Sequence, residues 1–349
     1  MNTLIEKLCK EHNLSDNELA ELIESDDAET AELLRQRADE VRQLHYGKKV
    51  FLRGLIEISS YCRNDCLYCG IRRSNKTAER YRLTREEILS CCENGYALGL
   101  RTFVMQGGED AFFTDEFLCG VVSEIKEKYP DCAVTLSVGE RSYESYKRLK
   151  EAGADRYLLR HEASDESLYS KLHPKELTIA NRKRCLFDLK ELGYQVGAGF
   201  MVGAPFQTTE HIIADLRFLQ ELQPQMIGIG PFVPHHMTPF ADKKGGSLEL
   251  TLRLLGILRL MFPKALLPAT TALGTIAEDG REQGLRTGCN VVMPNLSPVM
   301  VRKKYDLYDN KLCSGKESTE YLDELEESIN SAGYTVSRER GDAVGFSKI

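Results

Sequence analysis

Three cysteines lie close together in one short stretch of the chain, SSYCRNDCLYCGIRR. Cys62 and Cys66 are separated by three residues, and Cys66 and Cys69 by two. A structural zinc site usually has four protein ligands. The nearest histidines are the distant His45 and His161, so only a residue from elsewhere in the fold would complete one. A disulfide would leave one thiol over, and a catalytic thiolate needs one cysteine with a base. Three thiolates instead suit a 4Fe–4S cluster that keeps one iron open.

The open iron of such a cluster can bind the amine and carboxylate of S-adenosylmethionine (SAM). Electron transfer from the cluster then cleaves the sulfonium and leaves a 5′-deoxyadenosyl radical. The cysteine spacing, with the aromatic Tyr68 directly before Cys69, resembles the signature of the radical SAM family. The resemblance implies that Cys62, Cys66 and Cys69 hold the cluster and that Tyr68 lies beside the cofactor.

The segments around this loop alternate between strand and helix patterns. Eight strands are predicted, nearly all separated by a helix, at 50–59, 101–106, 133–139, 156–162, 195–203, 226–233, 265–272 and 290–294. This alternation predicts an α/β protein with a complete (β/α)8 TIM-type barrel and an N-terminal helical extension. A doubly wound sheet is the alternative. The predicted units are a helical extension (1–48), the barrel (49–310), and a C-terminal helix and tail (311–349).

The loops that follow the strands of a parallel barrel form its active face. The cysteine loop follows the first predicted strand and QGGED follows the second, while RHE closes the fourth and FVPHH closes the sixth. We therefore expect these four stretches to converge on one rim.

Two of these stretches resemble cofactor motifs of the radical SAM family. The QGGED stretch resembles the GGE motif, which implies that Gly107, Gly108 and Glu109 meet the methionyl amine of SAM. Glu162 stands where related enzymes bind the ribose hydroxyls, and its two oxygens match two hydroxyls. A plain glycine turn and a structural Arg–Glu pair are the alternatives.

Two further positions follow from the same resemblance. Arg182, in ANRKR, resembles the arginine that binds the SAM carboxylate, for which a guanidinium is well shaped. The stretch GAGFMVG resembles the glycine-spaced motif beside the adenine, where Met201 would supply an apolar contact. Ordinary core packing explains Met201 equally well.

Several stretches in their shared order resemble the HydE family, the radical SAM maturases of FeFe-hydrogenase: YCRNDCLYCGIRRSNK, QGGED, RYLLRHE, GIGPFVPH and GREQGLRTGCNVVMPN. The similarity runs over nearly the whole chain. It implies an electron donor and two partners, the tyrosine lyase HydG and the scaffold GTPase HydF. It also implies a small substrate, an organometallic iron–cysteine precursor with CO and cyanide, processed toward the two-iron subcluster of the H-cluster.

Position and resemblance together suggest where this substrate would react. Arg156 and Arg160 share one face of a predicted strand, so both should point into the barrel and supply positive charge. Thr270 and Thr271 end the predicted strand in PATTA and offer hydroxyls, and Tyr305 would cap the cavity. We place these five residues at the reaction site, with barrel packing as the alternative.

One region departs from the pattern of some HydE proteins, which carry a second iron–sulfur cluster on three C-terminal cysteines. The corresponding stretch here, NKLCSGKESTEYLDELEES, keeps only Cys313. We therefore predict a single cluster.

Three other functions compete with this interpretation. Biotin synthase shares the barrel and the cysteine loop, but it needs further cysteines on interior strands, and TFVMQGG and VTLSVGE have none. A methylornithine synthase, or another radical SAM enzyme with an amino-acid-like substrate, is a nearer alternative. A non-catalytic iron–sulfur scaffold is the alternative of another class. It would need no SAM pocket, and it would make no 5′-deoxyadenosine.

Composition limits the partners and the compartment. The 349 residues carry a net charge of −7, which argues against nucleic acid or an anionic membrane as a partner. There is no apolar run long enough for a transmembrane helix, and the charged N-terminus lacks the apolar core of a signal peptide. We therefore predict a cytoplasmic enzyme.

Overall fold

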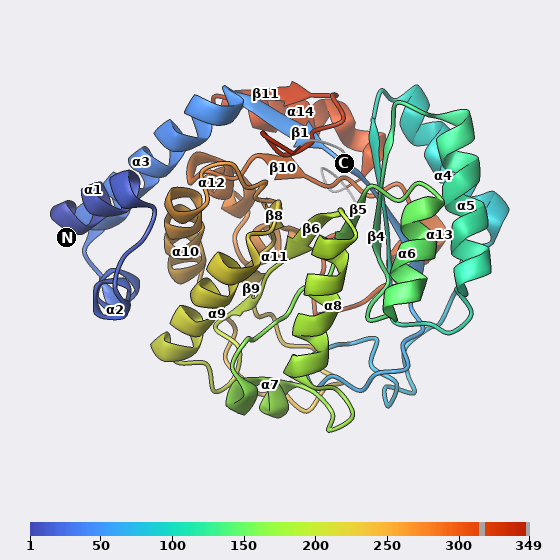
Figure 1. The fold of residues 1–349 in the computed structure, drawn as a ribbon, viewed down its shortest axis with the longest axis horizontal. Helices are drawn as coiled ribbons and strands as arrows, with labels where there is room; N and C mark the ends of the chain where they lie inside the picture. Colours follow the sequence, from blue (N-terminus) through green and yellow to red (C-terminus); the bar gives the residue numbers. More distant parts are fainter. Residues whose placement is uncertain (314–317, 347–349) are drawn as a thin grey trace.

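The computed structural model describes residues 1–313 and 318–346. Its centre is a six-stranded parallel sheet in the order β2-β3-β4-β5-β6-β8, enclosed by helices (Figure 1). The strands of this sheet are β2 (Gly54–Ser59), β3 (Thr102–Gly107), β4 (Ala133–Ser137), β5 (Arg156–Leu158), β6 (Gln195–Ala198) and β8 (Met226–Ile227). The parallel α/β arrangement agrees with the sequence prediction.

Two smaller groups of strands accompany this sheet, in the orders β10-β1-β11 and β7-β9. Their members are β1 (Lys49–Leu52), β7 (Met201–Val202), β9 (Gly230–Pro231), β10 (Val291–Val292) and β11 (Thr335–Ser337). The first predicted strand is thus split at Arg53 between β1 and β2. The C-terminal strand β11 pairs in parallel with β1, although the sequence predicted only a helix and a tail there.

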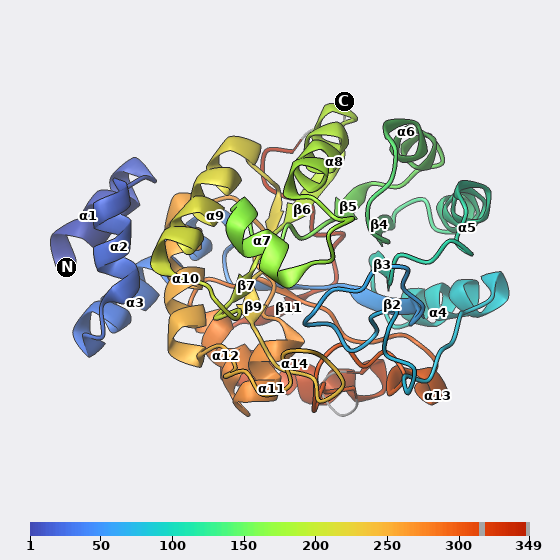
Figure 2. The same ribbon diagram turned by 90° about the horizontal axis from the view of Figure 1, so that it is seen from below.

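Helices surround the strands as a ring when the molecule is viewed from below (Figure 2). They are α1 (Asn2–Glu11), α2 (Asp16–Glu24), α3 (Ala28–Tyr46), α4 (Arg85–Ala97), α5 (Asp115–Lys128), α6 (Tyr143–Glu151), α7 (Glu166–Leu172), α8 (Ile179–Glu191), α9 (Thr209–Leu222), α10 (Leu248–Met261), α11 (Thr271–Ile276), α12 (Gly280–Arg286), α13 (Val299–Arg302), α14 (Leu322–Ser331) and the 3-10 helix η2 (Thr319–Tyr321). Because helices cover them, the central strands are buried almost throughout.

Local sequence explains where several helices begin. Ser15 and Glu18 form a capping box at α2, and Thr84 and Glu87 form one at α4, both as predicted. The N-terminal helices α1 to α3 lie at one side of the molecule in Figure 1, where α3 packs on α10 and α2 on α9. Among the described residues, no helix is both long and apolar enough to cross a membrane.

The seventh predicted strand, 265–272, is the clearest departure from the expected fold. It forms only isolated parallel bridges, from Leu266 to Met226 and from Pro268 to Val291. Pro268 has no N–H to donate to a neighbouring strand, and Thr271 already begins α11. Within the described ranges, the regular pairing therefore makes a parallel sheet and does not by itself close a barrel.

Candidate active site

The cysteine loop follows β2 directly and is held by three other segments of the chain. All three cysteines are half-buried and free of disulfides. Backbone N–H groups of the loop donate to carbonyl groups elsewhere: Arg63 to Glu109 (2.8 Å), Leu67 to Leu172 (2.9 Å) and Gly70 to Leu307 (2.8 Å). The loop is therefore positioned by the turn after β3, by α7 and by a C-terminal segment together.

The thiols of this loop are close enough to act on one another. Burial, together with the charges that Cys69 and Cys62 would carry, raises the pKa of the Cys66 thiol well above its usual value. Burial and Cys62 raise the pKa of Cys69 to about 12, and burial also raises the pKa of Cys62. Three thiols that oppose one another's ionisation need a bound cation to hold them as thiolates. This donor set fits an iron–sulfur cluster.

The two glycines after β3 lie against this loop. A Cβ on Gly108 would lie 2.2 Å from the carbonyl oxygen of Tyr61 and 2.7 Å from Cys62 Cβ, so only glycine fits there. Gly107 ends β3, and a Cβ there would meet Ile58 at 3.2 Å. The predicted contact between the GGE stretch and the cysteine loop is therefore present in the fold.

Glu109 lies on the outer side of this contact. Its Oε2 is 3.0 Å from Arg63 Nη2, and its Oε1 accepts the backbone N–H of Glu140 at 3.0 Å. Its carboxylate lines a surface groove that also contains Arg63 and Glu140. Glu109 does not line the cavity that opens from the cysteine loop.

A cavity of about 220 Å³ opens from the cysteine loop. The predicted site residues that line it are Tyr68, Cys69, Arg160, Glu162, Met201, Thr270 and Thr271. They come from the cysteine loop after β2, the segment after β5, the strand β7 and the start of α11. The meeting of the loops after β2 and β5 agrees with the parallel topology.

Glu162 has a strained backbone at this cavity. Its φ of +65° lies in the left-handed region, which costs an L-residue about 1–2 kcal/mol. Its N–H donates to the Gly199 carbonyl at 3.0 Å, and its carbonyl accepts the Met201 N–H at 3.2 Å. The strain is therefore maintained by pairing with the segment before β7.

Polar atoms on the cavity wall lack protein partners. Glu162 Oε2, Arg160 Nε and Thr270 Oγ1 are buried and have no hydrogen-bond partner among the described residues. Arg160 Nη2 lies 3.0 Å from Glu162 Oε2, an ion pair without hydrogen-bond alignment. Buried polar groups normally have partners, so these atoms fit a polar ligand. Hydroxyl groups and a carboxylate, both of which SAM carries, are suitable partners for them.

Arg182 is buried behind this wall. Its Nε donates to Glu140 Oε1 at 2.5 Å, and its Nη1 donates to the Arg160 carbonyl at 2.6 Å. Burial works to lower the pKa of Arg182, but Tyr169 and Glu140 outweigh it and hold the pKa above its usual value. Arg182 does not line the cavity itself. It contacts the backbone of Arg160, which does.

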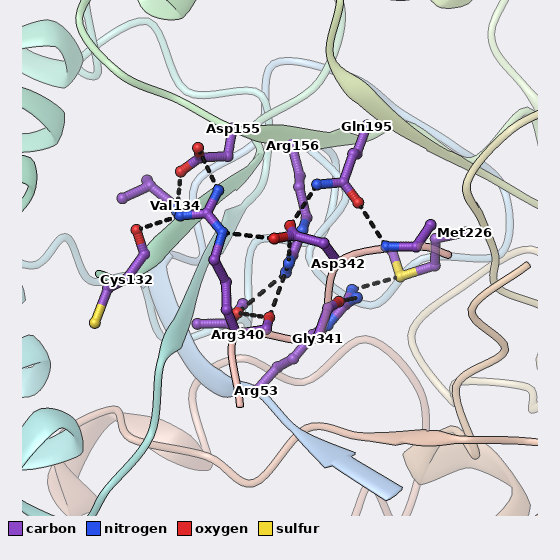
Figure 3. Close-up of polar contacts among 12 residues, drawn as sticks. Arg53, Cys132, Val134, Asp155, Arg156, Gln195, Met226, Arg340, Gly341 and Asp342 are labelled. Atoms are coloured by element: carbon purple, nitrogen blue, oxygen red, sulfur yellow. Dashed lines mark hydrogen bonds and ion pairs between the residues drawn. The ribbon is translucent and has the colours of Figure 1, made fainter. Parts of the chain in front are cut away.

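Two of the five predicted reaction-site residues do not line the cavity. Arg156 was expected beside Arg160; it is buried, but its guanidinium contacts Thr102 Oγ1 of β3 at 3.1 Å and Asp342 near the C-terminus at 2.7 Å (Figure 3). The strand β5 ends at Leu158, so the alternation that would align Arg156 with Arg160 does not continue. Tyr305 is buried, and its hydroxyl accepts Gln106 Nε2 at 3.4 Å. Gln106 itself lines the cavity.

Sequence analysis missed a buried charge pair on the cavity wall. Glu57 is fully buried in β2, and its carboxylate contacts Lys311 Nζ at 2.7 Å and Asn295 Nδ2 at 2.9 Å. Both Glu57 and Lys311 line the cavity. An acidic residue inside the apolar strand GLIEIS was a signal that could have identified Glu57. Nothing in the polar tail singled out Lys311.

Lys311 belongs to a segment, residues 305–311, that we name the strap. The strap contributes Leu307, Tyr308 and Lys311 to the cavity wall. Two contacts bind it to the loop after β9: His235 Nε2 to Asp306 Oδ2 at 3.0 Å, and His236 Nδ1 to Asp309 Oδ1 at 2.6 Å. The predicted rim stretch FVPHH therefore holds the strap over the cavity.

A loop of three cysteines, whose Cys69 lines a cavity together with a carboxylate and a guanidinium that have atoms without hydrogen-bond partners, is typical of radical SAM enzymes. The model of the Radical SAM superfamily matches residues 56–219. The chain belongs to the HydE family: it is 44% identical to the FeFe hydrogenase maturase subunit HydE of Thermotoga maritima, over 93% of this chain and 92% of that protein. Its cofactors are a 4Fe–4S cluster and SAM, those of the radical SAM class.

Two further comparisons relate the chain to an enzyme with an amino-acid product. It is 32% identical to the 3-methylornithine synthase of Methanosarcina acetivorans, over 82% of this chain and 81% of that protein. The crystal structure of methylornithine synthase (PylB) superimposes with a TM-score of 0.84, at 28% identity, over 96% of this chain and 97% of that one. The predicted α/β fold is thereby confirmed as that of radical SAM enzymes.

Proposed function

We propose that this enzyme acts in FeFe-hydrogenase maturation, on an iron–cysteine precursor with CO and cyanide that is processed toward the two-iron subcluster of the H-cluster. When bound, the cluster supplies the electron that cleaves SAM to a 5′-deoxyadenosyl radical. The observation that carries the proposal is the position of Cys69 on the wall of a cavity whose charged groups, Arg160 and Glu162, have buried atoms without hydrogen-bond partners. A scaffold protein would have no use for such a cavity.

In this proposal the chain holds its cofactors from two sides. Cys62, Cys66 and Cys69 ligate the cluster, and Gly108 lets the turn after β3 approach the same loop. Glu162 accepts hydrogen bonds from the ribose hydroxyls. Tyr68 and Met201 supply apolar surface, Gly107 and Glu109 hold the methionyl amine, and Arg182 meets the carboxylate or acts through Arg160.

The substrate residues in this proposal are those on the cavity wall. Arg160 attracts an anionic substrate, and Thr270 and Thr271 offer hydroxyls from the start of α11. Tyr305 supports Gln106 from behind the wall. Arg156 has no part in this site. The cavity of about 220 Å³ suits a small molecule.

We also propose that the strands enclose this cavity as a complete (β/α)8 barrel. Isolated parallel bridges support it, because they link β8 to Leu266, Pro268 to Val291 in β10, and Asn295 to Leu55 in β2. The barrel would span residues 49–310, with 1–48 as the helical extension and 311–349 as the C-terminal unit.

An anaerobic maturation assay tests the function. Apo FeFe-hydrogenase is incubated with HydF, HydG, SAM and a reductant, with and without this protein. We expect hydrogenase activity that depends on this protein. If no activity appears while the same sample still makes 5′-deoxyadenosine, the radical chemistry stands and the substrate is an amino acid, as the relation to methylornithine synthase suggests.

The single-cluster prediction has its own test. Replacing Cys313 by Ala should leave the iron content at about four atoms per chain, because one half-buried thiol cannot hold a second cluster. Iron analysis and EPR of the reduced protein measure this. A loss of about half of the total iron in Cys313→Ala would contradict the prediction.

A further inference from the structure

A buried histidine–aspartate contact lies directly behind Glu162. His161 Nε2 is 3.2 Å from Asp215 Oδ1 of α9, a close contact without hydrogen-bond alignment, and both side chains are fully buried. The same Asp215 oxygen accepts the backbone N–H of Ser164 at 2.5 Å. One carboxylate on α9 therefore holds the residues on both sides of the Glu162–Ala163 dipeptide.

The other edge of the His161 ring reaches the segment that pairs with Glu162. His161 Nδ1 accepts the Gly199 N–H at 3.4 Å, so the ring proton belongs on Nε2, facing Asp215. The Gly199 carbonyl in turn accepts the Glu162 N–H at 3.0 Å. The His161 ring thus links Asp215 to the backbone that keeps Glu162 in its left-handed conformation.

Stability alone does not account for this carboxylate. A buried carboxylate is costly, and Asp215 Oδ2 and Ser164 Oγ have no hydrogen-bond partner in the described part of the chain. An apolar residue of similar size would often be equally or more stabilising in such a place. Residues kept in strained conformations occur at functional sites when their surroundings over-determine them. The contacts of Asp215 provide such surroundings for Glu162.

We infer that Asp215 is a positioning residue for SAM binding, which acts by holding His161 and Ser164 so that the Glu162 carboxylate stays directed into the cavity. The inference rests on the proposed role of Glu162 at the ribose. It adds α9, which lies outside the cavity wall, to the elements that determine SAM affinity.

The test is a double-mutant cycle on the cluster-loaded protein. In Asp215→Ala, the oxygen that faces both the Ser164 N–H and the His161 ring is removed, so neither residue is held by α9. We expect the Kd for SAM to rise about tenfold, the size of one good hydrogen bond. Glu162→Gln should weaken binding at least as much, and adding Asp215→Ala to it should have little further effect. Anaerobic equilibrium dialysis with labelled SAM measures all four proteins.

Controls separate positioning from general damage. Iron content should be unchanged in every variant. Asp188→Ala makes the same substitution on α8, where Asp188 pairs with Arg184, and it should bind SAM like the wild type. If Asp215→Ala does not fold, His161→Gln removes the ring that faces Asp215 and should raise the Kd similarly.

Two results would overturn the inference. One is unchanged SAM affinity in folded, cluster-loaded Asp215→Ala. The other is independent losses that multiply in the double variant, because Asp215 would then not act through Glu162. A cluster-loaded wild-type protein with no affinity for SAM would overturn the proposed function, and this inference with it.

Discussion

Replacing Cys62, Cys66 or Cys69 by Ala is expected to remove the cluster and all SAM cleavage. A cubane with two protein thiolates has two irons without ligands from the chain, and the loop offers no nearby replacement. Iron should fall from about four atoms per chain to less than one. The formation of 5′-deoxyadenosine should fall to background. Iron analysis, EPR of the reduced protein and product chromatography measure these losses.

A matched cysteine elsewhere gives the control for this prediction. Cys119 on α5 is also half-buried and free of a disulfide, and it packs against the core far along the chain from the loop. Cys119→Ala should keep its iron and its SAM cleavage. Full iron content in any of the three loop variants would show that the cluster is held elsewhere.

The second large effect is expected in stability, at the C-terminal end of the chain. Figure 3 shows Asp342 between Arg156, Arg340 and Gln195. Asp342 Oδ1 lies 2.7 Å from Arg156 Nη2 and 2.5 Å from Gln195 Nε2, and Oδ2 is 2.8 Å from Arg340 Nε. Burial works to raise the pKa of Asp342, but Arg156 and the Gln195 hydrogen bond outweigh it and hold the pKa well below its usual value.

Asp342→Ala should lower the free energy of unfolding by about 3 kcal/mol, because it leaves the buried guanidinium of Arg156 without its counter-charge. Arg156 is only 3% exposed, whereas Asp342 is about one third exposed, so we expect the lower end of the range for broken buried pairs. Arg53 is fully buried nearby and adds a second positive group. Burial and the charge of Arg156 both lower the pKa of Arg53 strongly. Anaerobic urea unfolding, followed by circular dichroism, measures the change.

An exposed pair provides the comparison for this variant. Arg338 Nη2 and Glu326 Oε2 lie 2.9 Å apart, with both side chains about 40% exposed. Glu326→Ala should cost less than about 1 kcal/mol. A similar small cost for Asp342→Ala would mean that water or a neighbouring group compensates Arg156, and that the C-terminal contact contributes little to the fold.

Local sequence was sufficient for the cluster loop and for most helices. The cysteine spacing predicts ligands because a cluster needs only a few thiols within one loop. Capping boxes identify helix starts because the hydrogen bonds span three residues. The order of strands and helices predicted a parallel sheet, and with it the convergence of the rim loops. Those features rest on contacts between residues close in the chain, or on a topology that the alternation of elements already implies.

Features built from distant parts of the chain depend on the packed fold. The sequence placed Arg156 beside Arg160, but the short β5 and Asp342, 186 residues later, direct it elsewhere. Lys311 reaches Glu57 across 254 residues, and Asp215 reaches Ser164 across 51. The hydrophobic periodicity of the sequence does not indicate such contacts, because a buried charge pairs with whichever partner the packed fold brings close to it. The residue types and their local spacing thus indicate the chemistry of this protein, whereas long-range packing selects the charged residues that surround the site.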